Sequence, residues 1–328
     1  MTRAETLQKE LLEQEIAFLT QQIEAAYEQK RTLLSDAEKI SIDLQIKNLF
    51  GKMEQAEAQL KTLEHTEKSP AQHALDLETY LPAIDFQQAA EHVQQVLDRL
   101  GSRGGAALFF LQNSYLMGGA WFIRRIKDRL KSVSRSFREY NVGVSDDMRP
   151  DEFGIISRLA EYFGVSFQTT DGAQGAAARI VDYLCGGEVV RTKDIIFIEI
   201  RGWGELDSPD SALQRFIEGF WQPLVQRLPT ITQYEDFKFI AFITAEDKLP
   251  EPGLPASVCC QIQNFQPAYA LELTLTPWTP EDVRDLCGYT GRTSAEITRM
   301  AGRVYQRSQQ GIPQYVSMTL TDYLRDLT

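Results

Sequence analysis

The sequence predicts an α/β fold in which a doubly wound parallel sheet is preceded by an α-helical hairpin. Apolar residues repeat at three- and four-residue steps through much of residues 1–66, which is typical of amphipathic helices. From residue 84 onward, short apolar runs alternate with segments of helical periodicity. That alternation is typical of a parallel sheet with right-handed crossovers. Residues 67–83 contain two prolines and keep neither period, so they are expected to be a linker.

Residues 1–66 are expected to form two long helices that pack as an antiparallel, coiled-coil-like hairpin. Ser35 and Glu38 have the spacing of a capping box, which would begin the second helix. Such a hairpin buries little apolar surface on its own, so we expect it to bind a protein partner or a second copy of itself. A plain coiled-coil spacer is the alternative. The apolar residues expected at its interaction surface are Leu12, Ile16, Leu19, Leu49 and Met53.

The α/β domain, residues 84–328, is expected to alternate strands with helices and to end in a small helical region. The runs at 194–200 and 237–243 are apolar almost throughout, as in strands that are buried on both faces. The expected strands are 107–111, 138–144, 194–200, 237–243 and 271–275. The expected helices are 86–100, a helix that begins after residue 118, 153–163, 176–184, 212–228, 280–287, 294–307 and 318–327.

The turn after the strand at 107–111 has the position of a phosphate-binding loop but lacks its chemistry. A loop of the form G-x-x-x-x-G-K-[ST] holds phosphates through backbone amides and the Lys, and its hydroxyl binds Mg²⁺. When Gly118 is aligned with the second glycine, Asn113 takes the place of the first. Gly119 then replaces the Lys, and Ala120 replaces the hydroxyl residue. We therefore expect a degenerate loop of the P-loop NTPase type that takes no cofactor.

The strand at 194–200 is where such folds keep an acid that holds Mg²⁺. It contains Glu199, which we interpret as a vestigial acid, while Arg201 follows the apolar run. Thr244 ends the next strand, at the position of a γ-phosphate sensor, but a hydroxyl that caps the loop is the commoner case. The cysteines and histidines show no metal-ligand spacing. We therefore expect no catalytic residue, no metal site and no enzymatic activity.

Two further features are candidates for interaction. Trp121 is expected to fill the vacant phosphate pocket, with its ring buried against the end of the first strand. A surface aromatic that is open to a partner is the alternative. Residues 124–138 contain seven basic residues and one acid, and the simplest interpretation is the solvated face of an amphipathic helix. Arg124, Arg125 and Lys127 would lie at its surface if it docks an acidic partner.

Composition limits the function further. The net charge is −12 and the pI about 4.9, so nucleic acid is not expected as a partner, because phosphate contacts dominate such binding. No apolar run approaches the roughly 20 residues that span a membrane, and no secretory leader opens the chain. We therefore expect a cytoplasmic protein without a membrane partner.

Residues 84–328 resemble the inactive STAND domain of bacterial, especially cyanobacterial, conflict and signalling proteins. The degenerate loop Gly118-Gly-Ala-Trp-Phe122 is similar to the family's G-x-x-W-L at the place of the Lys. The strand at 195–200 and the segment Pro277-Trp-Thr279, which follows a short strand, are similar as well. The hairpin resembles the effector-associated modules of such systems in position and size. The resemblance implies an adaptor that couples a recruiting module to a larger complex without nucleotide turnover.

Two other functions stay open on the sequence alone. One is a divergent but active STAND-type ATPase, in which bases of the 124–138 helix replace the missing Lys. The other is a nucleic-acid-associated protein that uses the same basic helix, although the net charge of −12 weighs against it.

Overall fold

The computed structural model describes residues 86–101, 104–145, 147–168, 170, 172–186, 194–230, 237–249 and 254–325, and residues 18, 19, 22, 42, 49, 52, 80, 81 and 84. Most of the predicted hairpin and linker lies outside the described residues. The chain divides into two compact units. The larger comprises Leu81–Val283 and Arg303–Thr319, and the other comprises Met1–Tyr80, Arg284–Gly302 and Leu320–Thr328.

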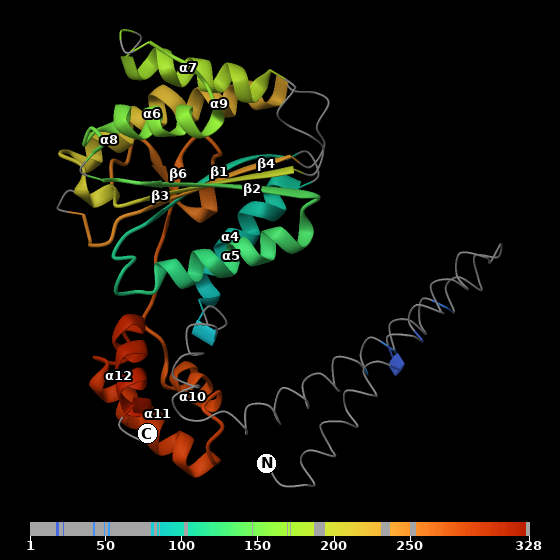
Figure 1. Ribbon diagram of the computed structural model, residues 1–328, viewed down its shortest axis with the longest axis vertical. Helices are drawn as coiled ribbons and strands as arrows, with labels where there is room; N and C mark the ends of the chain where they lie inside the picture. The colour runs from blue at the N-terminus through green and yellow to red at the C-terminus, as the bar shows by residue number, and fades with distance from the viewer. Residues whose placement is uncertain are drawn as a thin grey trace. The chain divides into compact units, whose positions relative to one another are not determined.

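A parallel sheet forms the centre of the larger unit, and its strand order is β2-β3-β4-β1-β6-β5 (Figure 1). Every neighbouring pair of these strands is parallel. Both faces of β1, β3 and β4 are buried, which explains their continuous apolar runs. The strands are β1 (Gly105–Leu111), β2 (Ser136–Gly143), β3 (Asp194–Arg201), β4 (Lys238–Thr244), β5 (Cys259–Cys260) and β6 (Ala270–Leu273).

Helices cover both faces of the sheet, so the doubly wound α/β prediction is confirmed. In Figure 1, α4 and α5 lie on one face, and α6 to α9 lie on the other. Three helices, α10 to α12, follow the sheet in the chain. The helices are α4 (Gln87–Leu100), α5 (Gly119–Val133), α6 (Glu152–Phe163), α7 (Gly172–Cys185), α8 (Pro209–Phe216), α9 (Gln222–Arg227), α10 (Pro280–Gly288), α11 (Ser294–Arg307) and α12 (Pro313–Arg325).

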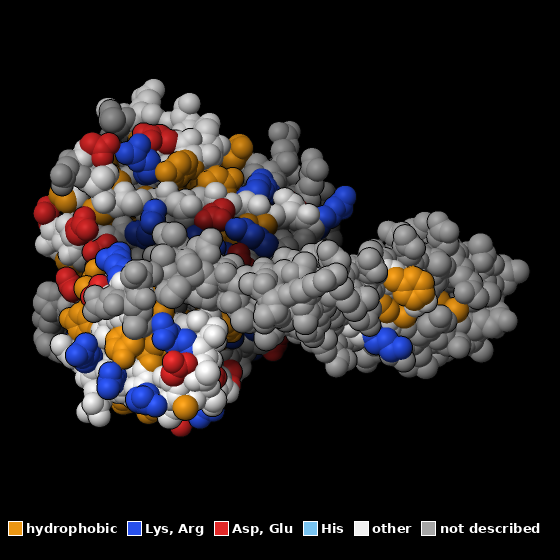
Figure 2. Space-filling model, turned by 60° about the horizontal axis from the view of Figure 1, so that its bottom comes forward, with side chains coloured by type: hydrophobic (Ala, Val, Ile, Leu, Met, Phe, Trp, Pro, Cys, Tyr) orange, Lys and Arg blue, Asp and Glu red, His pale blue; other side chains and the backbone are white. Residues whose placement is uncertain are grey.

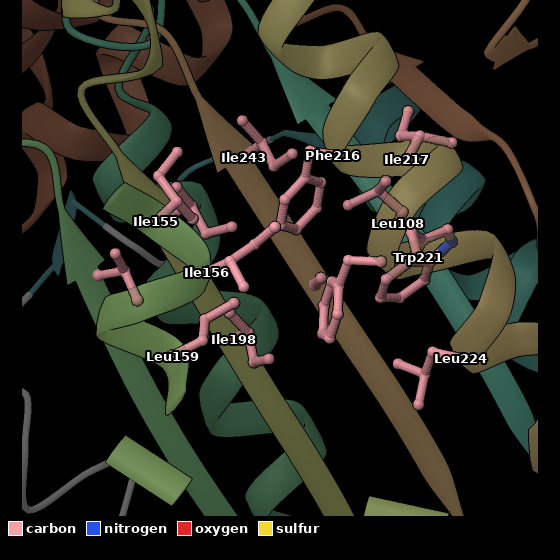
Figure 3. Packing of buried hydrophobic residues seen from close by; sticks show 14 of the residues in the cluster. Leu108, Ile155, Ile156, Leu159, Ile198, Phe216, Ile217, Trp221, Leu224 and Ile243 are labelled. Carbon is pink, nitrogen blue, oxygen red and sulfur yellow. The ribbon is translucent and has the colours of Figure 1, made fainter. Parts of the chain in front are cut away.

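The main core lies between the sheet and the layer of α6 to α9. Figure 3 shows side chains of this layer directed toward those of the strands. The two buried indoles of this core keep their N–H groups bonded. Trp203 donates to the Pro209 carbonyl, and Trp221 donates to the Pro267 carbonyl, both at 2.8 Å. The labelled core residues are Leu108, Ile155, Ile156, Leu159, Ile198, Phe216, Ile217, Trp221, Leu224 and Ile243.

Two predicted elements need correction. The predicted basic helix at 124–138 is wrong at its end, because α5 stops at Val133. The Val133 side chain is 71% exposed, so it does not anchor the helix to the core. Ser134 turns to an extended conformation, and Arg138 lies in β2. The predicted helix at 212–228 is interrupted by a π-helical turn, η5 (Ile217–Trp221), between α8 and α9. Side-chain periodicity hardly changes over one π turn, so the sequence pattern does not reveal it.

The structure describes a few residues within the predicted hairpin region. Leu19 and Leu49 are both helical and buried, and they form a small apolar cluster. Phe18, beside Leu19 in the sequence, is 58% exposed. Leu12, Ile16, Met53 and the capping box lie outside the described residues, so their roles stay predictions. No described helix has both the length and the apolar character required to cross a membrane.

Candidate functional site

The loop between β1 and α5 lies at the carboxyl end of β1, which is flanked by β4 and β6. Ligands bind at such crevices in open parallel sheets. Three consecutive amides of this loop instead donate hydrogen bonds to carbonyl oxygens of the segment after β4, residues 245–247. The pairs are Asn113 with Asp247 at 3.1 Å, Ser114 with Ala245 at 3.0 Å, and Tyr115 with Glu246 at 3.3 Å. In phosphate-binding loops, backbone amides are among the groups that hold phosphate oxygens.

The side chain of Ser114 reinforces this closure. Its buried hydroxyl donates to the Ala245 carbonyl at 2.9 Å, beside the backbone bond between the same two residues. Asn113 has a φ of 52°, in the left-handed region. Asn is among the few side chains that visit this region routinely, so it can replace a glycine here without changing the course of the loop.

Gly119, at the position of the Lys, has no room for a side chain. A Cβ built at Gly119 would lie 2.7 Å from the Cβ of Ser114, closer than atoms of this kind approach. The amide of Gly119 also donates to the Ser114 carbonyl at 2.7 Å. Gly118 has a φ of 72°, and a Cβ there would lie 2.6 Å from the ring of Trp121. Both glycines are therefore required by the closed loop.

Trp121 lies over Gly118 and stacks on Trp278, with ring centroids 5.9 Å apart and an interplanar angle of 26°. Trp278 is buried and packs edge-on against Phe86. Trp121 itself is partly buried, so the expectation that its ring fills the vacant phosphate pocket against the end of β1 stays a prediction. The ring finds its support in Trp278 because that residue approaches from the segment that follows β6.

The segments near the C-terminus also hold this loop through backbone bonds. The amide of Gln314 donates to the Leu116 carbonyl of the loop at 3.1 Å. Outside the loop, the amide of Trp278 donates to the Gly311 carbonyl at 2.8 Å and so fixes the backbone of the residue on which Trp121 stacks. The loop is thus held by the 245–247 segment and by the first turn of α12. These bonds depend on backbone groups alone, so the residue types gave no signal for them. In the sequence, Trp278 stands out only as part of the Pro277-Trp-Thr279 resemblance.

Glu199 is paired with a base of α5. It is 6% exposed and forms an ion pair with Lys127. The Lys127 ammonium also lies 2.6 Å from the carboxylate of Glu139 and 5.3 Å from the centre of the Phe197 ring. Arg201 lies 3.9 Å from Glu199. The vestigial acid therefore has its charge compensated by protein groups.

The pKa of the Glu139 carboxyl reflects the charges and hydrogen bonds of this cluster. Its burial tends to raise the pKa of the carboxyl, but hydrogen bonds from Lys127 and Asn141 and the charge of Lys127 outweigh burial. The net result is a pKa below its usual range. The cluster thus favours charged carboxylates beneath α5.

The basic residues of the 124–138 segment differ in their surroundings. Arg125 donates to the Ile84 carbonyl at 3.0 Å, while Arg124 is exposed. Arg138 pairs with Asp194 at 3.0 Å.

Thr244 is buried, and its hydroxyl lies 3.5 Å from the Ile200 carbonyl, which fits a cap at the strand end. On the face drawn in Figure 2, basic and acidic side chains of the described residues are interspersed. Within the described part of the chain, no group of three acids, His or Cys is placed to hold a metal.

This fold defines a class: doubly wound α/β domains with a parallel sheet that is covered by helices on both faces. The chain belongs to the inactive STAND family, whose model matches residues 81–244, half of the chain. A second model, effector-associated domain 9, matches residues 2–63. The chain is therefore STAND-related, and the resemblance seen in its sequence is confirmed.

Comparison with solved structures finds similar chains at low identity. The Aeropyrum pernix ORC1 protein in complex with DNA has 15% identity and a TM-score of 0.43, with 76% of this chain and 63% of that chain covered. The Aeropyrum pernix ORC2 protein in its ADP form has 10% identity and a TM-score of 0.42, with 71% and 60% covered. Saccharomyces cerevisiae RIF2 has 10% identity and a TM-score of 0.39, with 78% and 87% covered. The chain thus spans about three fifths of these two ORC proteins. No curated protein matches it.

Proposed function

We propose that the protein is a non-catalytic adaptor in a bacterial signalling or defence complex. Residues 1–66 recruit a protein partner, residues 67–83 are the linker, and residues 84–328 are a scaffold that works without nucleotide. The family supports a signalling role. The single observation that carries the adaptor role is the loop at residues 113–115, whose amides are bonded to the 245–247 segment.

Nucleotide would have to displace protein groups at each element that normally binds it. The loop amides would lose three backbone hydrogen bonds, each worth about 0.5–1.5 kcal/mol. Gly119 leaves no room for a Lys. Lys127, the base of α5 that an active relative could have used, pairs with Glu199 and Glu139. This arrangement favours the adaptor over the divergent ATPase.

Nucleotide binding tests the first half of the proposal. Calorimetry of the full chain with ATP and Mg²⁺ should give no heat of binding, and ATP should leave thermal unfolding unchanged. A nucleotide present at 100 times its Kd would instead stabilise the fold by about 2.7 kcal/mol. Mg²⁺-dependent binding at micromolar concentrations would overturn the proposal.

Loss of the partner from a purified complex tests the second half of the proposal, that residues 1–66 recruit a protein. Leu19 and Leu49 pack together, so the exposed Phe18 is the better candidate for contact with a partner. Full chain with Phe18→Ser should lose its complex partner on purification from the native cell, because exposed aromatics often anchor interfaces. Lys52→Ser, also exposed in this region, is the matched control. Equal recovery of the partner with both variants would count against recruitment through this surface.

A further inference from the structure

The turn between α11 and α12 holds its backbone in an unfavourable conformation. Gln309, Gln310 and Gly311 follow one another with φ angles of 52°, 63° and 90°, all in the left-handed region. Glycine adopts that region freely, but the Cβ of another residue comes too close to the following carbonyl oxygen there. Gln also lacks the short polar side chain with which Asn and Asp visit this region. Two successive strained residues therefore precede α12, and we call residues 308–314 the α11–α12 strap.

The described part of the chain has this kind of strain at one other place, and the strap is bonded to it. Asn113, in the loop after β1, is the remaining described residue other than glycine with a positive φ. The amide of Gln314, at the end of the strap, donates to the Leu116 carbonyl of the same loop at 3.1 Å. Strained residues persist only where surrounding contacts hold them, and they cluster at ligand clamps and switch regions. The strap and the loop are therefore candidates for a conformational device.

Backbone contacts with Trp278 hold the strap in place. The amide of Trp278 donates to the Gly311 carbonyl at 2.8 Å. A Cβ built at Gly311 would clash with the Trp278 carbonyl oxygen, so only glycine allows this approach. Within the strap, the amide of Gly311 donates to the buried hydroxyl of Ser308 at 3.3 Å. A few hydrogen bonds thus oppose the strain, and their joint loss would free the strap.

The indole of Trp278 adds a second unfavourable feature at the same place. Its ring is buried, and its Nε1–H finds no acceptor among the described residues. A buried donor without a partner keeps the full cost of its desolvation, and native structures contain few such groups. The donor would regain a hydrogen bond to water if Trp278 were uncovered. The closed arrangement is therefore destabilised both in the strap and in the residue that the strap contacts.

We propose that the α11–α12 strap is a strained clasp, which opens as one unit while the sheet stays folded. Opening breaks its bonds to Leu116 and Trp278, relaxes Gln309 and Gln310, and frees the loop at the carboxyl end of β1. A partner that binds only the open form would hold the clasp open, because a ligand shifts an equilibrium toward the state that it binds better. The inference does not rest on the adaptor role, since the clasp opens in the chain by itself.

Hydrogen exchange of the full chain, followed at single amides by NMR, tests the clasp. The amides of Trp278 and Gln314 donate the two bonds that opening breaks, so they should share one protection factor. That protection factor should lie about 100-fold or more below that of the central β1 amides, because local opening needs less free energy than global unfolding. Equal protection of all these amides would mean that the strap opens only when the whole domain unfolds, and it would overturn the inference.

Glycine substitutions separate a strained clasp from ordinary fraying. Gln309→Gly and Gln310→Gly should each raise both protection factors about threefold or more, because glycine takes the left-handed conformation without strain and its extra freedom in the open form offsets only part of the gain. Gln306→Gly is the matched control, because it makes the same change at an exposed helical position of α11. Glycine destabilises a helix interior, so Gln306→Gly should not raise either protection factor. The inference fails if the strap variants leave both protection factors unchanged or lower them.

Discussion

Gly119 and Ser114 show how a closed loop constrains single residues. The two side-chain positions are so close that only a residue without a Cβ fits at 119. A residue with a Cβ at 119 would therefore displace Ser114, whose hydroxyl donates to the Ala245 carbonyl. A Lys placed at 119 by itself would therefore clash with its neighbours unless the loop moved.

The first prediction concerns this position. Gly119→Lys should destabilise the fold by about 1–3 kcal/mol, as overpacking does, and should not create ATP binding. Ala120→Thr is the matched control, because Ala120 is exposed and surface changes stay within about 0.5 kcal/mol. Urea unfolding and calorimetry measure the two effects. ATP binding by the double variant Gly119→Lys, Ala120→Thr would show that the loop can reopen.

The second prediction concerns the stacked indoles. Trp278→Ala should lower the free energy of unfolding by about 3–5 kcal/mol, since the ring is buried. Trp121→Ala should cost only about 1–2 kcal/mol, because its ring is partly exposed. Trp278→Phe should cost far less than Trp278→Ala, since the indole N–H finds no acceptor among the described residues. Denaturant unfolding of these variants gives the order, and a larger loss at Trp121 than at Trp278 would contradict the stacking described.

Among the elements, α5, β2 and β3 are joined by one partly buried ion cluster. Lys127 of α5 contacts Glu139 of β2 and Glu199 of β3. The side chains of Lys127 and Glu199 are 13% and 8% exposed, so neither charge can turn to solvent without moving the helix. Burial of a pair stabilises little by itself, but removal of one partner leaves a costly charge.

The third prediction follows from this cluster. Lys127→Met should destabilise the fold by about 3–5 kcal/mol at pH 7. Lys131→Met is the matched control, because Lys131 is 48% exposed and lies 3.5 Å from Glu139, so about 0–1 kcal/mol is expected. A small effect of Lys127→Met at pH 7 would show that the cluster is solvated.

The ion pair of Lys127 and Glu139 predicts that the free energy of unfolding depends on pH. The pKa of Glu139 is lowered in the folded protein, so its contribution to stability is present above pH 4.5. It is lost as the pH falls below 4.5 through the folded pKa. The stability difference between wild type and Lys127→Met should therefore narrow in acid. Urea midpoints measured from pH 7 down to about pH 3 test this.

The sequence predicted elements well where burial leaves a pattern. The β1, β3 and β4 strands were located to within about two residues, because strands buried on both faces are continuous apolar runs. The two-residue β5 is too short to leave such a pattern. At the site, the missing Lys at Gly119 could be read directly. The carbonyls of residues 245–247 could not, because every residue type offers the same backbone acceptor.

At the scale of the whole molecule, the predicted boundary between hairpin and α/β domain is still a proposal. The larger unit begins at Leu81, near the proposed domain start at residue 84. Its sheet and main core are built from residues after 104. Within the described part of the chain, the strands of that sheet all lie between residues 105 and 273.

The fourth prediction tests this boundary. Deletion of residues 1–66 should leave a folded, monodisperse α/β domain whose unfolding midpoint lies close to that of the full chain. The deleted protein should lose its complex partner while keeping the near-ultraviolet circular dichroism of its buried tryptophans. Aggregation or loss of that signal would mean that the hairpin belongs to the core.

In the adaptor that we propose, the bonds between the loop and residues 245–247 also determine when the protein can act. A switch that releases a diffusible nucleotide reads the cell's ratio of ATP to ADP, and hydrolysis limits how long it stays on. Here the occupant of the loop is part of the same polypeptide, so it arrives with synthesis and leaves only with degradation. The signal is then set by copy number and by mass action on the complex, and a starved cell and a well-fed cell with equal copies would assemble it equally.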